Sequence, residues 1–165
     1  MVRFVMKVLC EKNLIKIINE AKKSKRKRAH HLLHSSHLEK VQRIIIALLR
    51  NTYIQPHSHS SPHQWESFVV LKGSVRLVTF NNSGIVSFIK NLKQGDIIEL
   101  KPKTIHTLLS LSEVSVVYEI KEGPFFEEDA KEIVAWAPDE NSTESNEFLR
   151  KLYRVRVGAN VSIVQ

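Results

Sequence analysis

Short apolar runs separated by turn residues dominate residues 29–121 of this 165-residue chain, and no long helical segment lies between them. The runs are rich in Val, Ile, Leu, Phe and Thr and have the length of strands. Parallel sheets need helical crossovers, so this spacing favours antiparallel strands in a barrel or sandwich. The chain is therefore predicted to be all-β. The expected strands are 29–33, 41–49, 52–56, 66–71, 74–80, 85–92, 96–100, 107–111 and 114–121.

A short helix is expected ahead of the strands. Leu14, Ile17, Ile18 and Ala21 have the spacing of one buried helical face, which predicts a helix over 13–21. We accordingly divide the chain into an N-terminal helical segment with a basic run (1–28), a β-barrel (29–140) and a C-terminal extension (141–165). The extension mixes basic and apolar residues, a pattern that fits a short helix, a strand or partial disorder.

Positive charge is concentrated near the N-terminus. The net charge is +8, and residues 1–50 carry 13 Lys and Arg against 3 Asp and Glu. The run from Lys22 to Arg28 is either a site for an anionic partner or a solvated helix end. No aromatic residues are interleaved with it, so nucleic acid is not an expected partner.

Membrane insertion and secretion are not expected. No apolar run approaches the length that spans a bilayer, and Val2–Leu9 is too short and too interrupted for a signal peptide. A single cysteine cannot form an internal disulfide, which fits a reducing compartment. These features predict a cytoplasmic protein.

Histidines and one glutamate have the spacing of metal ligands. His57 and His59 follow an expected strand, and alternate residues of an extended chain point to the same face. Glu66 opens the next apolar run, and His106 ends a separate segment that begins at Gly95. Such a set suits one divalent ion: Fe, Mn, Zn, Ni or Co.

This arrangement resembles the two motifs of the cupin superfamily: His-x-His, Glu and Gly, followed by Gly, Pro and His. Six residues separate Glu66 from Gly73, as in the first motif. Two departures are present. Six residues separate His59 from Glu66, where three or four are usual, so Gln64 is an alternative ligand. The glycine usually found between Pro102 and the final histidine is missing. The resemblance implies a cupin-type (jelly-roll) β-barrel.

A narrower resemblance covers about residues 10–140. The chain is similar to the WbuC family of cupin-fold metalloproteins, which is bacterial and associated with O-antigen and other surface-polysaccharide gene clusters. The resemblance implies a metal-binding barrel and a sugar or sugar nucleotide as the small-molecule ligand. The segments that carry it are His34–Ser36, Val41–Arg43, Pro56–His59, Trp65–Glu66, Tyr118–Pro124 and Trp136–Glu140.

Five further residues are candidates for the pocket beside the metal. Glu119 and Lys121 share one face of a strand, and they form either a buried pair near the metal or an ordinary surface pair. Gln64 lies before the expected ligand Glu66, and His34 belongs to the family resemblance. Tyr118 is a candidate acid or base.

Three functions stay open at this point. The leading one is a metal-binding cupin that acts on or binds a small polar molecule; any enzyme activity would then be metal-dependent. The second is a non-catalytic ligand-sensing or regulatory module. The third is a metal-independent sugar-phosphate isomerase or epimerase that uses His106 or Tyr118. Fold analogy also suggests a homodimer.

Overall fold

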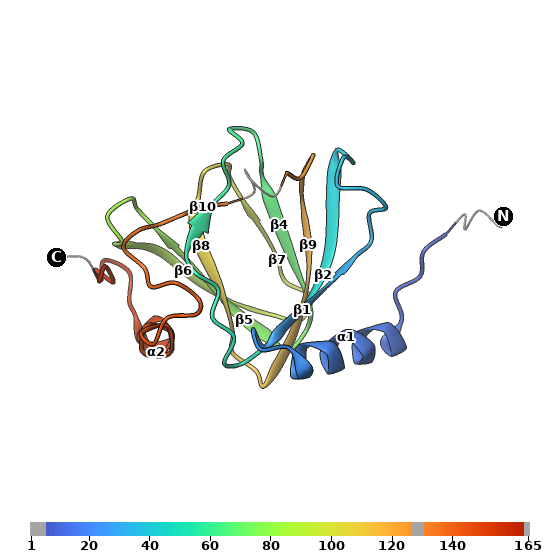
Figure 1. Ribbon diagram of the computed structural model, residues 1–165, viewed down its shortest axis with the longest axis horizontal. Coiled ribbons are helices and arrows are strands. Elements are labelled where there is room, and N and C mark those ends of the chain that lie inside the picture. Colours follow the sequence, from blue (N-terminus) through green and yellow to red (C-terminus); the bar gives the residue numbers. More distant parts are fainter. Residues whose placement is uncertain (1–5, 127–130, 164–165) are drawn as a thin grey trace.

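The computed structural model describes residues 6–126 and 131–163, which form two antiparallel sheets flanked by two helices, α1 (Glu11–Lys23) and α2 (Ser145–Arg154) (Figure 1). Within these described ranges, neither helix combines the length and the apolar character needed to cross a membrane. The predicted all-β fold with an N-terminal helix is confirmed. The strands are β1 (Arg28–Leu32), β2 (Val41–Leu49), β3 (His57–Ser58), β4 (Glu66–Lys72), β5 (Ser74–Phe80), β6 (Val86–Lys93), β7 (Ile97–Leu100), β8 (Ile105–Ser110), β9 (Val114–Glu122) and β10 (Glu132–Ile133).

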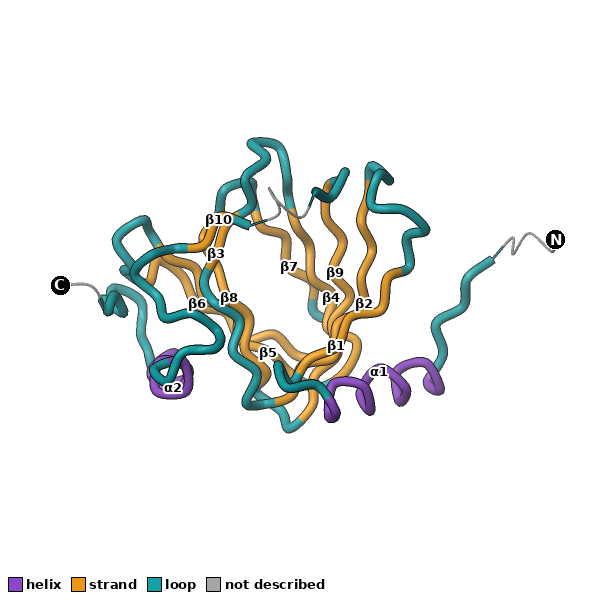
Figure 2. Tube along the Cα trace, in the orientation of Figure 1, coloured by secondary structure: helices purple, strands orange, loops and turns teal. Residues whose placement is uncertain are grey.

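The two sheets face each other across a shared apolar interior. Their strand orders are β1-β2-β9-β4-β7 and β10-β3-β8-β5-β6, and Figure 2 shows them on either side of that interior. Phe68, Val70 and Val117 from the first sheet join Leu77 and Leu108 from the second in one buried cluster. Burying each such side chain contributes about 1.5–3 kcal/mol. This interior holds the two sheets together and surrounds the site described below.

Helix α1 covers the outer face of the first sheet. Its buried residues Ile17, Ile18 and Ala21 belong to one cluster with residues of β2 and β9. The helix begins two residues before the predicted range because Asn13 Oδ1 accepts a hydrogen bond from the Cys10 backbone N–H at 3.0 Å, closing the first turn. The first sheet is therefore covered outside as well as inside.

The predicted strand over 52–56 is wrong. This segment is irregular, and it is held by side-chain hydrogen bonds instead of backbone hydrogen bonds to a neighbouring strand. Tyr53 Oη donates to the Pro138 carbonyl at 2.9 Å, and Gln55 Nε2 donates to the Ala137 carbonyl at 3.1 Å. The strand begins only at β3, which pairs with β8 and with β10, a two-residue strand that the sequence pattern did not predict.

The C-terminal extension contains α2, the helical alternative among those left open by its sequence. Phe148, Leu149 and Leu152 of this helix are buried in one cluster with Val78 and Trp136. The extension therefore contributes to the core on the side of the second sheet.

Candidate metal centre

Three buried histidines meet at the junction of β3 and β8. His57 is directly opposite His106 in the strand pair, and His59 lies two residues further along. Their ring centroids are 4.7 Å apart for His57 and His106, and 5.4 Å apart for His57 and His59. One ligand nitrogen from each ring lies within 4.8 Å of the others. All three side chains are buried.

Backbone carbonyls orient two of these rings. His57 Nδ1 donates to the Gln55 carbonyl at 2.9 Å, and His106 Nδ1 donates to the Thr104 carbonyl at 3.0 Å. A carbonyl oxygen can only accept, so Nδ1 of each ring carries a proton, and Nε2 is the nitrogen left to coordinate a metal. Histidines that ligate metals are commonly held by this kind of contact on the other nitrogen. The rings are thus oriented for coordination through Nε2.

Glu66 reaches the histidines from the first sheet. Its Oε2 lies 3.0 Å from His106 Nε2 and 3.3 Å from His59 Nε2. Glu66 is the first residue of β4, and it is 3% exposed. The structure thus brings together all four residues that the sequence proposed as ligands, in spite of the long loop before Glu66.

Charges within the site favour the ligating form of Glu66. Burial alone would raise the pKa of Glu66, but the His106 charge and hydrogen bonds from His106 and His59 hold it well below its usual value. Burial lowers the pKa of His57 well below its usual value, aided by the nearby charge of Lys131. Burial would also lower the pKa of His106, but the Glu66 carboxylate raises it. The carboxylate is therefore ionised, and the His57 imidazole is neutral.

A second buried ion pair adjoins the centre. Lys121 Nζ lies 2.8 Å from Glu119 Oε1 and 4.0 Å from Glu66 Oε1. Burial would lower the pKa of Lys121, but the charges of Glu119 and Glu66 raise it. Of the two orientations left open by the sequence, the structure shows the inward one.

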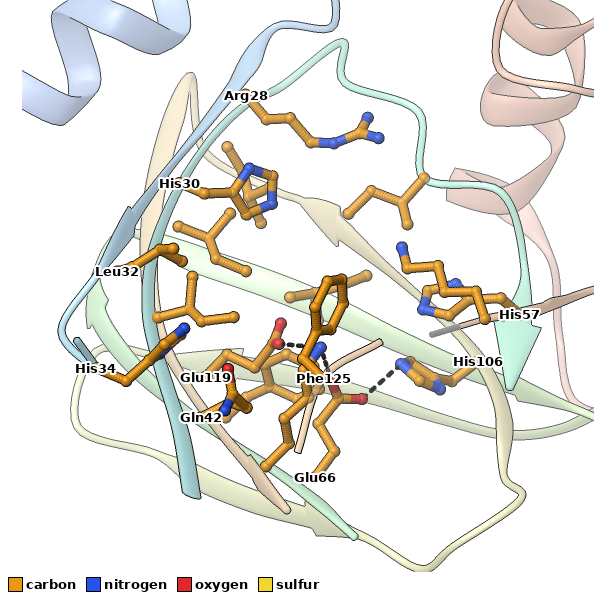
Figure 3. Close-up of a pocket in the computed structure, with 18 of the residues that line it drawn as sticks. Arg28, His30, Leu32, His34, Gln42, His57, Glu66, His106, Glu119 and Phe125 are labelled. Atoms are coloured by element: carbon orange, nitrogen blue, oxygen red, sulfur yellow. Dashed lines mark ion pairs between the residues drawn. The ribbon is translucent and has the colours of Figure 1, made fainter. Parts of the chain in front are cut away.

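A cavity of about 270 Å³ opens beside these groups, and Figure 3 shows Glu66, His57 and His106 at one side of it and His34 at the other. Its polar lining also includes Arg28, and Phe125 lies over its centre in that view. The apolar part of the lining consists of Leu32, Ile44, Ile46, Leu48, Ile54, Phe68, Leu108 and Phe125.

The five pocket candidates do not all lie in this cavity. His34, Glu119 and Lys121 line it. Tyr118 does not, because it lies on the opposite face of β9 and packs in the cluster beneath α1. Gln64 lines a separate cavity, and its Nε2 donates to the Glu122 carbonyl at 2.8 Å. The carboxylate at the histidines is therefore that of Glu66.

Sequence reasoning missed several residues that line the cavity, among them Arg28, Gln42 and Lys131. The position of Gln42 carried a signal. It alternates along β2 with Ile44 and Ile46, which also line the cavity. Lys131 carried no such signal, because it precedes a two-residue strand without alternation.

Comparison with solved structures identifies the fold. The chain is similar to a conserved protein with a double-stranded β-helix domain from Klebsiella pneumoniae, with a TM-score of 0.52, 19% identity, and coverage of 67% of this chain and 87% of that one. It is similar to an HTH_3 family transcriptional regulator from Vibrio cholerae (TM-score 0.51, 19% identity, 69% and 61% covered). It is also similar to a variant of oxalate decarboxylase from B. subtilis (TM-score 0.51, 17% identity, 64% and 27% covered). The predicted cupin-type fold is confirmed.

Comparison of the sequence with family models gives a match to one family. The family model described as "Domain of unknown function (DUF6016)" matches residues 9–92, just over half of the chain. No curated protein matches the chain significantly.

Proposed function

The chain belongs to the family of that domain, DUF6016, and we propose that it is a metal-binding cupin. In this proposal His57, His59, His106 and Glu66 hold one divalent ion. The protein binds, or acts on, a small polar molecule in the adjoining cavity. The metal would be Fe, Mn, Zn, Ni or Co, all of which accept imidazole and carboxylate ligands.

The three buried histidines carry this proposal. Burying polar rings is unfavourable unless they have polar partners. These three histidines are buried together, and two of them contact the Glu66 carboxylate, which is the arrangement expected of metal ligands. The carbonyl contacts at His57 and His106 engage Nδ1, so Nε2 is the nitrogen of each ring that would ligate the metal. A divalent ion held there would polarise a carbonyl or hydroxyl group, or lower the pKa of bound water.

The resemblance to the WbuC family supports a narrower form of the proposal. In that form the protein is cytoplasmic and takes part in surface-polysaccharide metabolism, with a sugar or sugar nucleotide as a candidate molecule. Purified protein tested with such compounds would show binding that depends on the loaded metal.

A ligand-sensing module is the second candidate. Lys22, Lys23, Lys25 and Lys27 are exposed beside the end of α1, where they can meet an anionic partner. Salt-dependent association that is lost when these four charges are neutralised would favour this role. The isomerase alternative loses one of its proposed acid–base groups, because Tyr118 does not line the cavity.

Metal analysis of the purified full chain tests the leading proposal. We expect about one equivalent of metal in the parent protein and in His63→Ala, because His63 is exposed. His57→Ala and His106→Ala should contain far less. Equal metal content in all four proteins would contradict the proposal.

A further inference from the structure

The cavity beside the centre has an excess of positive charge. Among the described residues, four cationic side chains line it, against the two carboxylates of Glu66 and Glu119. Both carboxylates already lie within 4.0 Å of Lys121 Nζ. Arg26 and Arg28 share a third carboxylate, that of Glu140, so one positive charge remains in excess. A divalent ion at the histidines would add two further positive charges. An anionic group beside the metal is therefore favoured over a neutral one.

His34 presents an unpaired hydrogen-bond donor on the other side of the cavity. The Arg43 backbone N–H donates to His34 Nδ1 at 3.0 Å, and a backbone N–H can only donate. The Arg43 carbonyl, 3.2 Å from the same Nδ1, already accepts from the Leu33 N–H at 2.8 Å. The proton of the neutral ring is thus on Nε2.

Nothing in the described part of the chain accepts a hydrogen bond from this Nε2–H, although His34 is only 5% exposed. Leaving a buried donor unpaired is unfavourable. Figure 3 shows the His34 ring directed into the cavity. A ligand with an acceptor at this position would satisfy the donor.

Gln42 and Glu119 lie between these two polar regions in Figure 3, and much of the remaining lining is apolar. Ile44, Ile46 and Leu48 from β2, with Ile54 and Leu108, offer no hydrogen-bonding side-chain groups. Sugar hydroxyls placed against them would lose their hydrogen bonds to water without replacement. The volume of about 270 Å³ also lies just below the range of about 300–1,000 Å³ that is common for ligand pockets. A small acid thus fits this lining better than the sugar nucleotide that the family resemblance suggests.

We propose that the cavity binds a small carboxylic acid with an aliphatic body and a hydrogen-bond acceptor at its far end. The carboxylate lies at the metal and Lys121, the aliphatic chain lies along the apolar lining, and the acceptor meets His34 Nε2–H. The inference rests on the proposed function, because the metal supplies part of the anion site.

Matched pairs of acids test this ligand class. The full chain, loaded with one equivalent of Zn(II), is titrated calorimetrically with pentanoate, hexanoate and heptanoate. It is also titrated with 4-oxopentanoate, 5-oxohexanoate and 6-oxoheptanoate, with their amides, and with glucose. We expect one chain length to fit best, and its oxo acid to bind about fivefold tighter than the plain acid. The amides should bind at least tenfold more weakly, and glucose more weakly than every acid.

Substitution of His34 isolates the donor. His34→Phe should remove the preference for the oxo acid and leave binding of the plain acid within about twofold. His31→Phe is the matched control, because His31 is exposed on β1, just before the bend that holds His34, and does not line the cavity. It should keep the preference. The comparison of acids in the parent protein requires no variant, so it tests the ligand class even if His34→Phe fails to fold.

The outcomes separate the inference from the proposed function. A chain that takes up no metal overturns the proposed function and the metal contact together. A Zn(II)-loaded chain that binds none of the acids, or binds glucose more tightly, overturns the inference alone. An unchanged oxo-acid preference in His34→Phe would overturn the role of His34.

Discussion

His106 Nε2 lies 3.0 Å from Glu66 Oε2, and this contact joins β8 of one sheet to β4 of the other across the barrel interior. The carboxylate raises the pKa of His106 against the effect of burial, and the His106 charge helps to hold the pKa of Glu66 down. In the metal-free protein, at pH values below the raised pKa of His106, the pair is therefore an imidazolium and a carboxylate. A metal ion and the His106 proton compete for one nitrogen.

This competition predicts that metal binding releases a proton. Because the pKa of His106 is raised above its usual value of about 6.5, pH values from about 5 to 6.5 lie below it. Over that range the metal affinity should fall by about tenfold for each unit of acidification. Titrations of the apo protein with Zn(II) at several pH values measure this slope. An affinity independent of pH over the range would contradict the assignment.

Glu66 and Gln64 should differ sharply as ligands. Glu66→Gln keeps the shape of the side chain but removes its negative charge at the histidines, so we expect metal affinity to fall by more than about tenfold. Gln64→Ala removes a group that donates to the Glu122 carbonyl, and it should leave metal affinity within about threefold. Competition with a metal chelator measures both. A larger loss for Gln64→Ala would reverse the assignment.

Local sequence patterns predicted much of the fold. The ranges 41–49 and 74–80 match β2 and β5 as the structure has them, because each run is bounded by residues that end strands. The range 52–56 fails for a physical reason: its contacts are hydrogen bonds from Tyr53 and Gln55 to residues more than 80 positions away. Apolar character alone does not distinguish such a segment from a strand.

Local sequence patterns also predicted only part of the candidate site. Alternation places Tyr118 and Glu119 on opposite faces of β9, but it does not say which face is inside. The inner face is fixed by the packing of α1 against the outer face of the first sheet. Tyr118 is partly buried beneath α1, and Glu119 faces the cavity. The ligand histidines were predictable because their spacing along the chain is itself the signal. The unpaired His34 Nε2 depends on a contact with Arg43, which no spacing reveals.

Arg28 should stabilise the fold far more than its neighbour Arg26. Arg28 Nη2 lies 2.6 Å from both Glu140 oxygens, and its side chain is 3% exposed. Arg28→Ala removes this pair and also a bond to the Tyr53 carbonyl, and it should lower the free energy of unfolding by about 2–3 kcal/mol. The Arg26 side chain is 57% exposed, so Arg26→Ala should change it by less than about 1 kcal/mol. Urea denaturation compares the two, and equal losses would contradict this account.

The C-terminal extension should behave as part of the core. Leu152 on α2 is fully buried, so Leu152→Ala should lower the free energy of unfolding by about 2–5 kcal/mol. Lys151→Ala alters the exposed neighbour and should change it by about 0.5 kcal/mol at most. Thermal or urea unfolding monitored by circular dichroism provides the comparison. A negligible effect of Leu152→Ala would mean that α2 is not docked on the barrel.

Diffraction data collected at the absorption edge of a loaded metal test the central claim most directly. The account predicts one anomalous peak bonded to Nε2 of His57, His59 and His106, with Glu66 Oε2 beside it. Crystals of metal-loaded protein with no peak there, or with the ion held only by the exposed His30, His31 and His37, would contradict it.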